Sequence, residues 1–112
     1  MKIISTEDVK SKIERGEEFA LIEVLSPKSY EAYHLPTAIN VPVDRDEFDD
    51  NVKYVVPNKD TPVVVYCSDE QCAASAKAGR RLEELGYSDV MHYKAGKEGW
   101  RDAGFRGVQS EN

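Results

Sequence analysis

The sequence has few of the features that mark secreted or membrane proteins. Among its 112 residues are only two cysteines, two histidines and one tryptophan. No segment approaches the roughly 20 consecutive apolar residues that span a membrane. The N-terminus turns acidic at Glu7 and Asp8 before the apolar core of a signal peptide could form, so a cytoplasmic location is expected. In that compartment, Cys67 and Cys72 indicate thiol chemistry rather than a structural disulfide.

An excess of positive charge is also missing. Lys and Arg number 15 against 21 Asp and Glu, which gives a formal net charge of −6. This balance argues against nucleic acid or an anionic membrane as the main partner. The length fits one domain with a modest core and leaves no room for a second domain.

The most informative stretch covers residues 62–75, where a strand is predicted to pass into a helix. Residues 63–66 form a β-branched, apolar run, typical of a strand covered on both faces in a parallel sheet. From Ala73 to Leu85 the composition favours a helix, and Gly86 follows as its C-cap. Cys67 is therefore expected at the carboxyl end of a central strand, facing a helix N-terminus. Because free N–H groups and the helix dipole favour a thiolate there, Cys67 is the candidate nucleophile.

The rest of the chain alternates between predicted strands and helices with short connections. Strands are expected at residues 2–4, 19–25, 39–41 and 88–93; helices at residues 6–15 and 27–32 and around Trp100; a surface helix or loop at residues 44–51; and a loop at residues 94–99. This alternation predicts an α/β fold of three layers, α/β/α, with a mainly parallel sheet of about five strands. The domain is expected to cover residues 1–105, followed by a flexible tail at residues 106–112.

Four separate segments carry a family resemblance. They are the strand at residues 21–24, the histidine-hydrophobe-proline segment within residues 29–42, the strand and cysteine at residues 64–67, and the strand, loop and tryptophan helix at residues 86–90 and 95–104. In this order, from about residue 3 to residue 105, they resemble the rhodanese family of single-domain sulfurtransferases.

The resemblance implies that Cys67 is catalytic. A thiolate there would take a sulfane sulfur from thiosulfate, a polysulfide or a protein persulfide and pass it to a thiol or cyanide acceptor through a covalent persulfide. An acceptor protein is a further candidate partner, whereas no cofactor, nucleic acid or membrane is implied. The active-site loop would comprise Ser68, Asp69, Glu70, Gln71, Cys72 and Ala73.

The loop departs from the family pattern at two positions. Glu70 stands where the family usually has glycine, and Cys72 stands where it often has arginine. Asp69 and Glu70 are expected to raise the pKa of Cys67 and to repel thiosulfate. Cys72 is a candidate resolving thiol that could close a disulfide with Cys67, and the alternative is a small apolar residue packed inward. Outside the loop, Thr37 replaces a frequent glycine.

Four further residues are candidates for the substrate pocket: Glu23, Lys94, Lys97 and Trp100. The two lysines could restore positive potential near the loop or could belong to an ordinary solvated loop. Glu23 reads more readily as a salt-bridge or loop-anchoring carboxylate, and Trp100 as core or pocket wall.

Neither histidine is predicted to be catalytic, and no metal site is expected. His34 is interpreted as a turn histidine that hydrogen-bonds backbone, and nothing in the spacing joins His92 to the cysteines. The separation of Cys67 and Cys72 is a poor match to zinc ligands.

Two other functions remain open. A phosphatase or arsenate reductase of related fold needs an arginine six residues after the cysteine, where this chain has Ala73. A non-catalytic binding module on the same fold is favoured by the acidic loop and opposed by the presence of Cys67.

Overall fold

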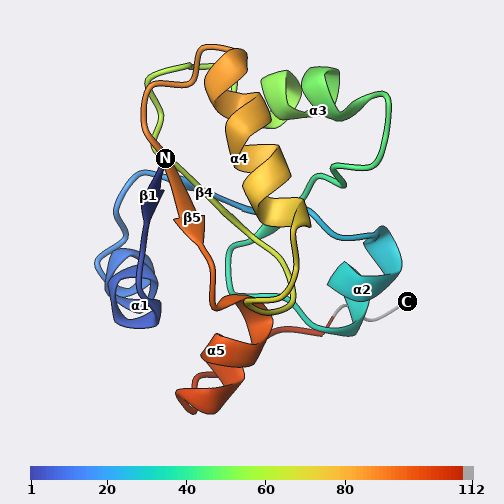
Figure 1. Ribbon diagram of the computed structural model, residues 1–112. Helices are drawn as coiled ribbons and strands as arrows, with labels where there is room; N and C mark the ends of the chain where they lie inside the picture. Colours follow the sequence, from blue (N-terminus) through green and yellow to red (C-terminus); the bar gives the residue numbers. More distant parts are fainter. Residues whose placement is uncertain (110–112) are drawn as a thin grey trace.

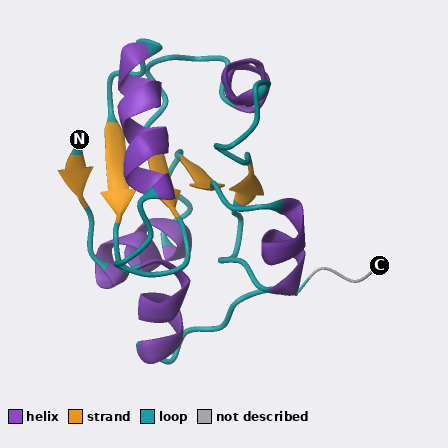
Figure 2. Ribbon diagram, turned by 45° about the vertical axis from the view of Figure 1, so that its right-hand side comes forward, coloured by secondary structure: helices purple, strands orange, loops and turns teal. Residues whose placement is uncertain are grey.

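The computed structural model describes residues 1–109 and shows a parallel sheet between two layers of helices (Figures 1 and 2). The strands are β1 (Lys2–Ile3), β2 (Ala20–Glu23), β3 (Ile39–Asn40), β4 (Val63–Tyr66) and β5 (Val90–Tyr93). The helices are α1 (Thr6–Glu14), α2 (Pro27–Ala32), α3 (Phe48–Val55), α4 (Ala74–Glu84) and α5 (Gly96–Asp102). The strand order is β1-β5-β4-β2-β3, and every pair is parallel. The predicted fold class is confirmed.

The central strand β4 divides the core into two apolar layers. Val63 and Val65 face the layer that contains residues of α3 and α4, and Val64 and Tyr66 face the layer that contains residues of α1 and α5. All four side chains are buried, as expected for a strand with helices on both faces. Figure 1 shows α3 and α4 together at the top of the view and α1 and α5 at the bottom.

Two helices begin where the sequence predicts them, because a serine caps each. The Ser5 side chain accepts a hydrogen bond from the Asp8 N–H at the start of α1, at 3.1 Å. The Ser26 side chain accepts one from the Ser29 N–H at the start of α2, where Pro27 occupies the first turn. Such caps satisfy backbone donors that have no partner within the helix.

The prediction of a loop over residues 94–99 is wrong, because a helix begins within this segment. The chain turns at Gly96, which has a φ of +62°, and α5 begins there instead of near Trp100. A Cβ at this position would lie 2.4 Å from the backbone oxygen of Cys67, so glycine is needed for both the turn and the close approach. The sequence pattern did not reveal this turn because glycine and lysine are also typical of loops.

The acidic segment also differs from its predicted bounds. A helix or loop was expected over residues 44–51, whereas α3 runs from Phe48 to Val55. Phe48 and Val52 lie one turn apart and are both buried against the core. The helix therefore follows the apolar spacing, not the acidic run before it.

The flexible tail over residues 106–112 stays a prediction. Residues 110–112 lie outside the described part of the chain. Before them, the Arg106 carbonyl accepts a hydrogen bond from the Trp100 indole, and His34 and Val108 exchange backbone hydrogen bonds of 2.9 and 2.7 Å. None of the helices within residues 1–109 combines the length and apolarity needed to cross a membrane.

Candidate active site

Cys67 follows directly after β4, at the carboxyl end of the sheet. Its side chain is only 1% exposed. The backbone of this loop is fixed by α5, because the Lys97 and Glu98 N–H groups donate to the carbonyl oxygens of Cys67 and Ser68 at 3.1 and 2.9 Å. The N–H groups in the first turn of α5, which have no partner within the helix, thus bind the loop backbone. These bonds fix the position of Cys67 close to the start of α4.

Cys72 lies next to Cys67. The two residues are joined by a disulfide, and their Cα atoms are 6.5 Å apart, within the separation of about 7 Å that such a bond allows. The loop between them is shaped by Asp69, whose carbonyl accepts from the Cys72 N–H and whose carboxylate accepts from the Gln71 N–H. This loop geometry holds the two sulfur atoms within bonding distance of each other.

A serine and a histidine lie behind Cys67, and the sequence did not point to either. Ser75 Oγ lies 3.1 Å from Cys67 Sγ and 2.7 Å from His92 Nε2. Ser75 is 1% exposed and His92 is 7% exposed. Burial, together with the positive charges of Lys94 and Arg80, lowers the pKa of His92.

Strand register explains this arrangement. His92 on β5 pairs with Val65 on β4, and Val65 points to the same face as Cys67 two residues later. Ser75 lies in the first turn of α4, which covers that face. The sequence predicts which side chains of each strand share a face, because side chains alternate with a period of two residues. It does not predict which strands pair, so it gave no sign that His92 lies near Cys67.

Glu23 and Lys97 form a buried ion pair on the opposite face of the sheet. Glu23 is 0% exposed, Lys97 Nζ lies 3.0 Å from its Oε2, and Tyr66 OH donates to its Oε1 at 2.8 Å. Lys97 also donates to the Ser29 carbonyl at 2.9 Å. Burial raises the pKa of Glu23 by more than the Tyr66 hydrogen bond and Lys97 lower it. The pair links β2, β4 and α5, and each charge offsets the other.

A cavity of about 290 Å³ opens beside the cysteine loop, and it is acidic. Its lining comprises Asp69, Glu70, Gln71, Ala95, Glu98, Gly99 and Asp102. None of the four residues predicted for the substrate pocket lines it. Glu23 and Lys97 are buried as described, Lys94 is exposed, and Trp100 packs in the core against Phe105. Among residues 1–109, the charged side chains that line this cavity are all carboxylates.

The two histidines differ in their surroundings. His34 Nδ1 lies 2.8 Å from the Tyr30 carbonyl, and its ring stacks on that of Tyr30, so its interpretation as a backbone-bonded turn histidine is confirmed. Within residues 1–109, no group of three or more His, Cys, Asp or Glu side chains could hold a metal ion.

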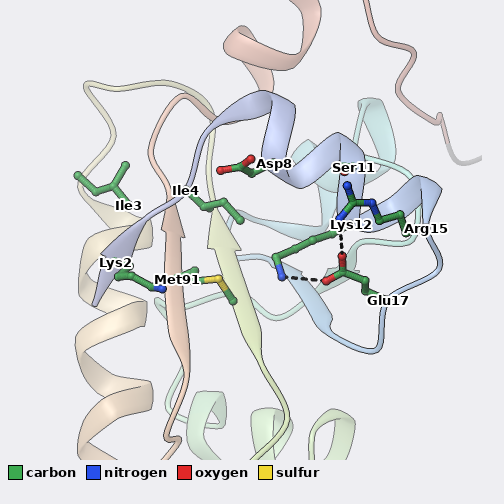
Figure 3. Close-up of a pocket in the computed structure, with 9 residues that line it drawn as sticks. All are labelled: Lys2, Ile3, Ile4, Asp8, Ser11, Lys12, Arg15, Glu17 and Met91. Atoms are coloured by element: carbon green, nitrogen blue, oxygen red, sulfur yellow. Dashed lines mark hydrogen bonds and ion pairs between the residues drawn. The ribbon is translucent and has the colours of Figure 1, made fainter.

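A second cavity, of about 370 Å³, lies between α1 and the strands β1 and β5 (Figure 3). Lys12 and Arg15 both reach Glu17 there, at 3.2 and 3.7 Å. No residue of the cysteine loop lines this cavity, so it is separate from the candidate active site.

A parallel α/β sheet with a cysteine in the short loop between its central strand and the next helix defines a class of α/β domains. Within that class the family is clear, because the sequence profile described as "Rhodanese-like domain" matches residues 5–103. The chain belongs to the rhodanese-like domain family.

Individual relatives agree with this assignment. The chain is 35% identical over 69 residues to the thiosulfate sulfurtransferase PspE of Escherichia coli (strain K12), a match that covers 62% of each protein. A thiosulfate sulfurtransferase from Pseudomonas aeruginosa superposes with a TM-score of 0.87 at 28% identity, covering 98% of this chain and 20% of that one. The polysulfide-sulfur transferase homodimer from Wolinella succinogenes has the same fold, with a TM-score of 0.78 at 22% identity, and the match covers 100% of this chain and 81% of that one.

Proposed function

We propose that this chain is a sulfurtransferase that carries sulfur as a persulfide on Cys67. The observation that supports this most directly is the position of Cys67 in a loop fixed by α5 amides, at the start of α4, in a chain of the rhodanese-like family. N–H groups at the N-terminus of a helix stabilise a nearby anion, and Ser75 in the first turn of α4 lies 3.1 Å from Cys67 Sγ. The names of the relatives from E. coli and P. aeruginosa favour a sulfane-sulfur donor such as thiosulfate.

The first half-reaction requires the reduced loop. The Cys67 thiolate attacks the sulfane sulfur of the donor, and a new S–S bond forms while the bond to the leaving group breaks. With thiosulfate the leaving group is sulfite, and Cys67 retains one extra sulfur as a persulfide. This is nucleophilic catalysis through a covalent intermediate.

In the second half-reaction the outer sulfur leaves Cys67. An acceptor thiolate or cyanide can attack that outer sulfur and restore the Cys67 thiolate. Alternatively, the Cys72 thiolate attacks the inner sulfur, which releases hydrosulfide and closes the Cys67–Cys72 disulfide. The second route makes Cys72 a resolving thiol, and an external dithiol must then reduce the disulfide before the next turnover. The Cα separation of 6.5 Å supports this role for Cys72.

The acidic cavity bears on the choice of donor. Asp69 and Glu70 belong to the loop itself, and Glu98 and Asp102 face the same cavity from α5. Like charges raise the energy of a bound dianion, so thiosulfate is expected to be a slow donor compared with a protein persulfide or a neutral sulfane sulfur. We accordingly propose a sulfane-sulfur donor and a thiol or cyanide acceptor. We also propose a cytoplasmic location.

Intact mass spectrometry of the reduced protein after brief exposure to thiosulfate, and separately to polysulfide, tests the proposal. Cys72→Ser is expected to accumulate one extra sulfur, and Cys67→Ser is expected to accumulate none. The wild-type protein should gain the same sulfur briefly and then lose it as it forms the disulfide and releases sulfide. Persulfide that persists equally in the wild type and in Cys72→Ser would exclude the resolving role without affecting that of Cys67.

The same measurement separates catalysis from binding. If neither donor loads Cys67 in the reduced protein even after prolonged exposure, the sulfurtransferase proposal fails. The chain would then be a binding module on a rhodanese-like domain, with the acidic loop as its contact surface. A phosphatase function is disfavoured, because Ala73 occupies the position where an arginine would hold the oxyanion.

A further inference from the structure

We propose that Ser75 and His92 form a proton relay behind Cys67, in which the Ser75 hydroxyl passes the Cys67 proton to His92 as the sulfur attacks its donor. The inference rests on the proposed role of Cys67 as the nucleophile. It assigns Ser75 and His92 as positioning residues that act through Cys67 without touching the substrate.

The geometry forms a continuous chain of hydrogen-bonding groups. Ser75 Oγ lies within hydrogen-bond distance of both neighbours, 3.1 Å from Cys67 Sγ and 2.7 Å from His92 Nε2. The Cys72 carbonyl oxygen competes for the Cys67 proton, but it lies farther away, at 3.6 Å. Of these two acceptors, which lie in the described part of the chain (residues 1–109), Ser75 Oγ connects onward to a base, His92.

The available donors and acceptors allow a proton to pass from Cys67 through Ser75 to His92. A serine hydroxyl has one proton to donate and can accept another, and a neutral imidazole has one nitrogen that accepts. Once the Cys67–Cys72 disulfide is reduced, the same positions allow Cys67 S–H to donate to Ser75 Oγ and Ser75 O–H to donate to His92 Nε2. Transfer breaks the S–H bond, replaces the hydroxyl proton of Ser75 and forms an N–H bond on His92. A thiolate and an imidazolium result, and no other reactant is needed.

The surroundings favour this route over direct loss of the proton to water. Cys67 and Ser75 are almost completely buried, so a bulk water molecule is a poor proton acceptor for the thiol. Because the pKa of His92 is lowered, the ring is neutral at neutral pH and is free to accept a proton.

Charged groups surround both ends of the relay. Lys94, which follows β5, and Arg80 on α4 lie near enough to His92 to oppose its protonation. Near Cys67, the loop carries Asp69 and Glu70, and Glu98 lies at the start of α5. The cations at one end and the carboxylates at the other both oppose the ion pair, so the thiol form is favoured at rest and the transfer accompanies attack.

The rate of alkylation of Cys67 by iodoacetamide, measured from about pH 5 to about pH 10, tests the relay. The measurement uses the full chain carrying Cys72→Ser, in which Cys67 is the only thiol, alone and with Ser75→Ala or His92→Gln added. Each added variant is expected to slow alkylation at neutral pH about tenfold and to move the midpoint of the rate profile by about one pH unit to higher pH. Without the base, only the fraction of Cys67 that is already ionised reacts, and that fraction changes tenfold with each pH unit below the pKa. Combining Ser75→Ala with His92→Gln in the Cys72→Ser protein should move the midpoint no further than either substitution alone.

His92→Gln separates the relay from a structural role. Glutamine can still accept a hydrogen bond from Ser75 but cannot take up a proton in this pH range. A structural role therefore predicts a profile for His92→Gln equal to that of the Cys72→Ser parent, and that result would overturn the relay. An unchanged profile for Ser75→Ala would also overturn it. Thermal unfolding of each variant verifies that it is folded.

Failure of the relay is distinguishable from failure of the proposed function. Alkylation reports the ionisation of Cys67 with no sulfur donor present. Profiles that shift as expected while no donor loads Cys67 would keep the relay and reject the sulfurtransferase proposal. The reverse pattern, with normal loading and superimposed profiles, would reject the relay alone.

Discussion

Thr37 adopts a backbone conformation that normally belongs to glycine. Its φ is +69°, and it is exposed, so its side chain gains little packing in return. A β-branched residue is strained in this left-handed region, at a cost of about 1–2 kcal/mol. Glycine would adopt this conformation without strain, which the sequence alone did not show.

Replacing Thr37 with glycine is expected to stabilise the protein. The relieved strain exceeds the greater entropy that glycine has in the unfolded chain, which leaves a gain of up to about 1 kcal/mol and a rise in Tm of about 4 °C. Thermal unfolding monitored by circular dichroism measures the change. Thr37→Ala is the matched control, because it removes the β-branch but keeps a Cβ, so it should give a smaller gain. A lower Tm for Thr37→Gly would contradict the strain.

At the scale of the elements, α5 does two jobs that depend on its early start at Gly96. Its first N–H groups bind the carbonyls of the cysteine loop, and its Lys97 side chain pairs with Glu23 of β2 on the face of the sheet opposite Cys67. The loop backbone and the buried ion pair are thus positioned by one helix. A change in the pair is expected to affect stability more directly than the chemistry of Cys67.

Lys97→Met is expected to destabilise the fold by about 3 kcal/mol or more at neutral pH, because it leaves the Glu23 carboxylate buried and unpaired. The pKa of Glu23 is already raised by burial and rises further without Lys97. A group whose pKa is raised on folding binds its proton more tightly in the folded state. Its contribution to stability is therefore fully present below the unfolded pKa and is lost as the pH rises through the folded value.

The loss of stability caused by Lys97→Met should accordingly be smaller near pH 4.5 than near pH 8. Urea unfolding at both pH values measures it. Lys94→Met, which removes an exposed lysine three residues earlier, is the control and should change stability little. Adding Glu23→Gln to Lys97→Met should recover part of the loss at the higher pH. An equal loss at both pH values would show that packing of the lysine stem, not the carboxylate, carries the effect.

At the scale of the whole molecule, negative charge dominates. The formal net charge is −6, and the cavity beside the cysteine loop is lined by four carboxylates. A dianionic donor therefore meets repulsion both at a distance and at the site, whereas a neutral reagent does not. The field of the protein is expected to select among sulfur donors by charge.

Salt should accordingly speed the loading of Cys67 by thiosulfate. Raising the ionic strength from about 0.01 M to about 0.15 M shortens the Debye length from about 30 Å to about 8 Å, and the loading rate is expected to rise roughly threefold to tenfold. Intact mass spectrometry of Cys72→Ser samples quenched at successive times measures the loading rate. Alkylation by the uncharged reagent iodoacetamide is the control and should change little. A loading rate that falls with salt would indicate positive potential at the loop.

The sequence by itself determined the fold class and the place of Cys67. The apolar run at residues 63–66, the serine caps at Ser5 and Ser26 and the change of composition at Ala73 are local signals, so they could be read without any tertiary contact. The four family segments were equally readable, because motif order along the chain is a property of the sequence.

Tertiary structure alone decided what surrounds Cys67. Strand register placed His92 beside Val65, and the turn of the chain through α4 placed Ser75 between His92 and the sulfur. Glu23 and Lys97 are far apart in sequence, but the fold brings them together as a buried ion pair. Neither residue lines the acidic cavity. These arrangements depend on which strands pair and on the phase of each helix. Contacts of that kind join residues distant along the chain, and no local pattern encodes them.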